Sequence, residues 1–137
     1  MKTDVPYRYY PDLVEMARDV EIMVVITPGG AATNNLVDEA VLEALGPQGL
    51  LVNVARGSVV DMDALIACLK DGRLGAAGLD VYPDEPNAPQ ELFDMTNVVL
   101  TPHIASATHD TRMAMGMLVY DNIKAFFAGE DLITPVN

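Results

Sequence analysis

Four side chains of complementary chemistry follow the predicted β-strands of this sequence: Arg56, Asp80, Glu85 and His103. A guanidinium can hold a small carboxylate through two parallel hydrogen bonds. A carboxylate beside an imidazole raises the pKa of the ring, which can then exchange a proton with a carbonyl or alcohol oxygen near neutral pH. Arg56, Glu85 and His103 therefore suit the interconversion of a 2-oxo acid and a 2-hydroxy acid. The hydride must come from a carrier, because no side chain can supply one.

Each of these residues also has a simpler interpretation. Arg56 can be a surface cation on an acidic protein, although the glycine after it indicates a tight turn. Asp80 can cap a turn, and Glu85 can be a solvated member of an acidic loop. His103 is the only histidine that follows a predicted strand, whereas His109 falls in a first helical turn, where an exposed histidine is unremarkable. The occurrence of these residues after consecutive strands favours the functional interpretation.

The elements that position these residues are predicted from short apolar runs that alternate with helical patterns. Such alternation is typical of an α/β domain with a parallel sheet. Strands are predicted over residues 22–26, 50–54, 76–79 and 98–100. Ligands bind beyond the carboxyl ends of the strands in an open parallel sheet, so the loops after these strands are expected to meet at one edge.

Capping residues bracket the predicted helices. Pro11 is expected at the first position of a short helix. Asp38 and Asp61 are predicted N-caps of two further helices, each of which ends at a glycine. Thr108 is the predicted N-cap of a long helix that extends to about residue 128 and stops at Gly129. Apolar residues cover more than one face of this last helix, which indicates that it packs on two bodies.

The composition excludes several classes of protein. The chain has 137 residues, half of them hydrophobic, and a formal net charge of -12, which fits one folded domain and disfavours nucleic acid and anionic membranes as partners. No apolar run approaches the roughly 20 residues that span a bilayer, and the N-terminal sequence has no signal-like apolar core. One cysteine, Cys68, and two histidines exclude an intrachain disulfide and a structural zinc site. We expect a cytoplasmic protein without a metal.

Three segments carry a resemblance to a known family. They are LVNVARGSVVD at residues 51–61, GLDVYPDEP at 78–86 and NVVLTPHIASAT at 97–108. In order and spacing they resemble the D-isomer-specific 2-hydroxyacid dehydrogenases, of the glyoxylate/hydroxypyruvate reductase or phosphoglycerate dehydrogenase type. The resemblance covers nearly the whole chain. It implies an NAD- or NADP-dependent oxidoreductase that acts on a small 2-oxo or 2-hydroxy acid.

The resemblance also implies a role for particular residues. Arg56 resembles the arginine that binds the substrate carboxylate, His103 the general acid and base, and Glu85 the acid that pairs with it. Asp80 resembles the partner of the nicotinamide carboxamide. The implied cofactor-binding residues are Ile26, Thr27, Pro28, Val54, Ala55, Arg56, Asp80, His103, Ala105 and Ser106.

The sequence departs from a complete family member in its organisation. Such a member has roughly twice this length, with a substrate domain and a G-x-G-x-x-G turn that are not found here. We therefore expect an incomplete Rossmann-like sheet of about four strands: residues 1–129 as a partial cofactor domain and 130–137 as a tail. Matched to strands 3 to 6 of the order 3-2-1-4-5-6, the first strand would be separated from the others.

Two other functions are compatible with parts of the pattern. A non-catalytic remnant could act as an interaction or oligomerisation module through its apolar last helix. A phosphoacceptor signalling domain would fit the size and the α/β alternation, but no acidic pair follows the first strand.

An incomplete sheet predicts self-association. Exposed strand edges and apolar helix faces are covered most simply by a second copy, with or without an exchange of strands or helices. Sedimentation of the purified chain at micromolar concentration is expected to give a homodimer. A single monomeric species that unfolds cooperatively would contradict this prediction.

Overall fold

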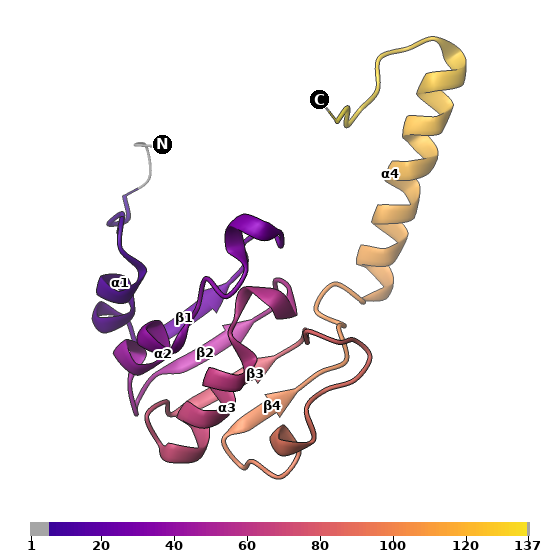
Figure 1. Ribbon diagram of the computed structural model, residues 1–137. Coiled ribbons are helices and arrows are strands. Elements are labelled where there is room, and N and C mark those ends of the chain that lie inside the picture. The colour runs from indigo at the N-terminus through magenta and orange to yellow at the C-terminus, as the bar shows by residue number, and fades with distance from the viewer. Residues whose placement is uncertain (1–5, 137) are drawn as a thin grey trace. The chain divides into compact units, whose positions relative to one another are not determined.

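The computed structural model describes residues 6–136 and divides into two compact units at the bond between Pro102 and His103 (Figure 1). Each unit is described by itself. Residues 1–5, where the sequence predicts no signal-like core, lie outside the described range. None of the described helices combines the length and the apolar character that a bilayer span requires.

The first unit is built on a parallel sheet, as the alternating pattern predicts. Its strands are β1 (Ile22–Val25), β2 (Leu50–Asn53), β3 (Ala76–Leu79) and β4 (Val98–Leu100), in the spatial order β1-β2-β3-β4 (Figure 1). All three pairings are parallel. The predicted α/β class is thus confirmed.

The predicted separation of the first strand is wrong. Along its whole length β1 pairs with β2, from Ile22 opposite Leu50 to Val25 opposite Asn53. In a sheet of order 3-2-1-4-5-6, consecutive strands are neighbours within each wing but not across the centre. Four consecutive strands that are all neighbours therefore do not correspond to strands 3 to 6 of that order. Among the described residues, the strand edges lie at β1 and β4, not at the second strand.

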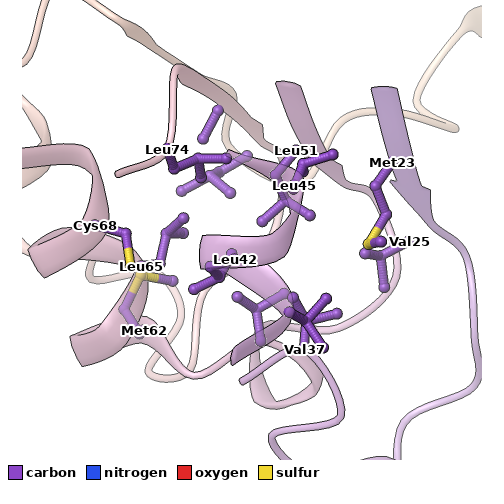
Figure 2. Packing of buried hydrophobic residues seen from close by; sticks show 14 of the residues in the cluster. Met23, Val25, Val37, Leu42, Leu45, Leu51, Met62, Leu65, Cys68 and Leu74 are labelled. Atoms are coloured by element: carbon purple, nitrogen blue, oxygen red, sulfur yellow. The ribbon is translucent and has the colours of Figure 1, made fainter. Parts of the chain in front are cut away.

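One face of the sheet is packed and the other is open. Three helices, α1 (Leu13–Asp19), α2 (Glu39–Leu45) and α3 (Met62–Asp71), contribute to a core with alternate strand residues. Figure 2 shows side chains of α2 and α3 beside those of β1 and β2. On the opposite face Ile22, Val24 and Val99 are 53–67% exposed, because successive strand residues point to opposite sides.

Aspartate side chains begin all three helices. The carboxylates of Asp12, Asp38 and Asp61 each accept a hydrogen bond from the amide three residues further on, at 2.9, 3.1 and 3.1 Å. The caps predicted at Asp38 and Asp61 are therefore confirmed. The prediction for Pro11 is wrong by two positions, because the Asp12 cap starts the helix at Leu13.

The second unit contains the long helix α4 (His109–Ala128), which has the predicted caps Thr108 and Gly129. Ala125 is its one buried residue among those described. The chain after α4 returns to it, because the Thr134 amide donates to the Asn122 side-chain oxygen at 3.2 Å. The large apolar side chains of α4 are exposed within this unit: Met113, Met115, Met117, Leu118, Val119, Tyr120, Ile123, Phe126 and Phe127.

Truncation of a core residue tests the packed face. Leu51 is fully buried in β2, so Leu51→Ala is expected to lower the free energy of unfolding by about 2–5 kcal/mol through lost burial and a residual cavity. On the open face, Val99→Ala should change it by no more than about 0.5 kcal/mol. Denaturant unfolding measures both variants, and equal losses would contradict the assignment of the two faces.

Candidate active site

The loops after the four strands begin at one edge of the sheet. The register aligns the terminal residues Val25, Asn53, Leu79 and Leu100 in one row. The segments that carry Thr27, Arg56, Asp80 and Thr101 therefore leave the sheet side by side, as the rule for open parallel sheets predicts.

The Arg56 turn is held against the loop that follows β3. Gly57 makes this possible, because a Cβ there would overlap the main chain of Tyr82 and Pro83. No residue larger than glycine fits such an approach without a backbone shift. The contact brings the turn after β2 directly onto the segment between Asp80 and Glu85.

The Arg56 side chain lies over the loop that follows β1. A Cβ built on Gly29 would come within 2.8 Å of the Arg56 Cγ, so the arginine stem lies directly over this glycine. The guanidinium Nη1 donates to the Ala55 carbonyl at 2.6 Å. Arg73, by contrast, is ion-paired to Asp71 and to the two α2 glutamates, 39 and 43, at 2.5–3.1 Å. A small anion can therefore approach Arg56 without competing against three carboxylates.

The buried Asp80 and Tyr82 and the half-buried Thr101 form a polar cluster where β3 and β4 end. The Thr101 hydroxyl donates to Asp80 Oδ1, and Asp80 is only 4% exposed. The Tyr82 hydroxyl lies 3.1 Å from the Leu79 carbonyl oxygen and 3.0 Å from that of Thr101. Burial raises the pKa of the Tyr82 phenol, and the Asp80 charge raises it further, so the phenol stays a donor at neutral pH. This phenol ties the ends of the two strands together.

Glu85 is oriented by the main chain of the same loop. The Tyr82 amide donates to Glu85 Oε1 at 3.1 Å. The Glu85 side chain is exposed. The bond from the Tyr82 amide holds the carboxylate against the main chain of the loop.

His103 opens the second unit, immediately after Pro102. Its backbone φ is 55°, in the left-handed region where His is several-fold enriched among non-glycine residues. His103, Ala105 and Ser106 are all exposed in the segment before α4. Because His103 and Glu85 belong to different units, their pairing stays a prediction.

The loop after β1 contains a buried polar atom that fits a ligand. Within residues 6–136, the Thr27 hydroxyl oxygen is buried and makes no hydrogen bond. Buried polar atoms without a partner are rare in folded proteins, and a bound group commonly satisfies them. Ile26 is 76% exposed and Pro28 is also exposed. Together with the small residues after Thr27, this loop fits the approach of a flat cofactor.

Sequence reasoning did not select three residues that organise the site: Asn53, Tyr82 and Thr101. Asn53 is fully buried, and its side chain bonds to both sides of the Arg56 turn. Asn53 lies two residues after Leu51 in the same strand, so its side chain points to the same face of the sheet. A polar residue on this buried face was the signal that the sequence offered. Tyr82 and Thr101 carried no such signal, since their partners lie on another strand or loop. The predicted Val54 and Ala55 lie in the Arg56 turn, 38% and 5% exposed.

A parallel sheet with small and polar loops at its carboxyl edge is typical of dinucleotide-binding domains. The family described as "D-isomer specific 2-hydroxyacid dehydrogenase, NAD binding domain" matches residues 2–105. The chain belongs to this family of NAD(P)-dependent oxidoreductases.

Several characterised relatives match almost the whole chain. Glyoxylate/hydroxypyruvate reductase A HPR2 of Arabidopsis thaliana is 48% identical over 99% of this chain, and glyoxylate reductase of Pyrococcus furiosus is 44% identical over 93%. The NADPH-dependent glyoxylate/hydroxypyruvate reductase of Sinorhizobium meliloti, solved with NADP and malonate, is 48% identical over 99% of the chain, with a TM-score of 0.94. The chain spans 44%, 38% and 43% of these relatives, less than half of each.

The close approach at Gly57 can be tested by adding one methyl group. Gly57→Ala is expected to lower the free energy of unfolding by about 1–3 kcal/mol or more, because the main chain of Tyr82 and Pro83 has to move. Gly116→Ala is the matched control. Nothing lies within 4 Å of a Cβ at this helical position, so it should raise stability by up to about 1 kcal/mol. Thermal unfolding compares the two, and a neutral Gly57→Ala would refute the tight contact.

Proposed function

We propose that this chain carries the catalytic edge of an NAD(P)-dependent D-2-hydroxyacid dehydrogenase. The reaction is hydride transfer between a nicotinamide cofactor and a small 2-oxo or 2-hydroxy acid of the glyoxylate or hydroxypyruvate type. The observation that carries the proposal is the contact of the Arg56 turn with the loop of Asp80 and Glu85, at the edge where ligands bind in such sheets. The substrates named for the relatives agree with this choice.

Arg56 binds the substrate carboxylate in this proposal. Its guanidinium can form two parallel hydrogen bonds to a carboxylate. The net charge of -12 makes the average field repulsive to anions, so binding depends on this local donor and not on steering by the whole surface. The Sinorhizobium meliloti relative was solved with malonate, itself a small carboxylate.

The cofactor, NAD or NADP, supplies the hydride when bound. Thr27 has the unpartnered hydroxyl described above, and Asp80 is fixed by Thr101, so both can serve as polar contacts for it. The smaller or apolar residues Ile26, Pro28, Val54, Ala55 and Ala105, together with Ser106, would line the same ligand. Arg56 and His103 are the remaining residues that we assign to the cofactor.

His103 is the proton donor and acceptor in this proposal. During reduction it gives a proton to the carbonyl oxygen of the 2-oxo acid, and in the reverse reaction it accepts one from the hydroxyl. In this proposal Glu85 is the acid that pairs with the His103 ring. The Tyr82 amide, which donates to Glu85 Oε1, would orient the carboxylate for this pairing.

A non-catalytic interaction module is the second candidate. The observation that favours it is α4, a 20-residue helix whose large apolar side chains are exposed within its own unit. Association with a second copy, as a homodimer, would cover these side chains or the exposed Ile22 and Val24 at the β1 edge. A cytoplasmic location fits both candidates, because the free Cys68 suits a reducing compartment.

The two histidines separate these candidates. With NADPH and glyoxylate, His103→Ala is expected to reduce kcat by about 100-fold or more, the usual contribution of general acid catalysis. His109→Ala, at the start of α4, should leave turnover unchanged. NADPH oxidation is followed by absorbance. Equal rates for both variants would contradict the role of His103, and absence of both cofactor binding and turnover in the unaltered chain would favour the interaction module.

A further inference from the structure

We infer that Asn53 is the positioning residue that holds Arg56 and Asp80 in their working arrangement. This inference rests on the proposed function, because it concerns the residues assigned to substrate and cofactor. Asn53 is the last residue of β2 and is fully buried. It therefore acts through its neighbours and not by touching a substrate.

The Asn53 carboxamide spans the turn that presents Arg56. Its Nδ2 donates to the Arg56 carbonyl at 3.1 Å, and its Oδ1 accepts from the Ala55 amide at 3.0 Å. Both ends of one planar group are thus used on two successive residues of the turn. Rotation of the turn would break both bonds in a buried setting, where an unsatisfied polar group is costly.

The Asn53 main chain extends the same control to the next loop. Its carbonyl accepts from the Asp80 amide at 3.0 Å. Arg56, which we assign to the substrate carboxylate, and Asp80, which we assign to the nicotinamide carboxamide, are therefore both hydrogen-bonded to Asn53. A displacement of about 1 Å at a reacting site can lower the rate on the order of 100-fold. The bonds from Asn53 to Arg56 and Asp80 are therefore expected to affect function.

A merely structural role for Asn53 predicts a different result. In that case its loss would lower stability but leave anion binding by the folded protein unchanged. Asn97 provides the matched control, because its Nδ2 donates to the Gly75 carbonyl at 3.0 Å, before β3 and β4 begin and so at the opposite edge of the sheet. Substitution by leucine removes from each asparagine the Nδ2 group that donates to a backbone carbonyl. Only Asn53 makes this bond to Arg56.

The test is a titration of the full chain with oxalate, a two-carboxylate probe, under conditions where every variant is folded. Asn53→Leu is expected to raise the Kd for oxalate by about 10-fold, and Asn97→Leu to leave it unchanged. Asn53→Asp keeps the size and the acceptor but loses the donor to the Arg56 carbonyl, so it serves if Asn53→Leu does not fold. It should also raise the Kd and lower the heteronuclear NOE of the amides of residues 55–57.

Arg56→Gln separates this inference from the proposed function. If Arg56→Gln weakens oxalate binding but both Asn53 variants bind like the unaltered chain, the positioning role is overturned while the proposed function stands. If Arg56→Gln leaves the Kd unchanged, or the unaltered chain binds no oxalate, the carboxylate role of Arg56 fails, and the positioning role fails with it. A rise in Kd for the Asn53 variants at unchanged Kd for Asn97→Leu supports the inference.

Discussion

The close approach of Gly57 to the main chain of Tyr82 and Pro83 is the constraint on which the rest of the site depends. It joins the turn after β2 to the loop after β3 without an intervening side chain. On one side of the contact lies Arg56, and on the other lie Asp80 and Glu85. The two loops, which the sheet alone would leave independent, are thus in direct main-chain contact.

Buried polar bonds hold the segments on both sides of that contact. Asn53 closes the turn after β2, while Tyr82 and Thr101 join the ends of β3 and β4. Asp80 is buried where β3 ends, and its carboxylate accepts a hydrogen bond from the Thr101 hydroxyl, which orients the side chain. Arg56 and Glu85 remain exposed at the surface of this frame. The two groups assigned to the substrate and to the proton-transfer pair are thus accessible, and the Asn53 side chain that holds the Arg56 turn is buried.

Local signals in the sequence were sufficient to predict the four strands and the caps of α2, α3 and α4. The capping aspartates at 38 and 61 and the glycine after α4 act within one helical turn, so their pattern could be interpreted without knowledge of the fold. Strand pairing is a long-range property, and the expected gap beside the first strand was wrong for that reason. The roles of Asn53, Tyr82 and Thr101 likewise depend on partners in other segments. Side-chain chemistry suggested a reaction for Arg56, Glu85 and His103, and the resemblance to a family implied the individual role of each.

The central claim is that Arg56, whose turn contacts the loop after β3, forms a site for a small carboxylate. Amide chemical shifts of the whole chain during an oxalate titration test it most directly. The account predicts that the largest changes fall in residues 54–58 and 80–85 and that Arg56→Gln abolishes them. Changes centred on the ion-paired Arg73, or changes that persist in Arg56→Gln, would contradict it.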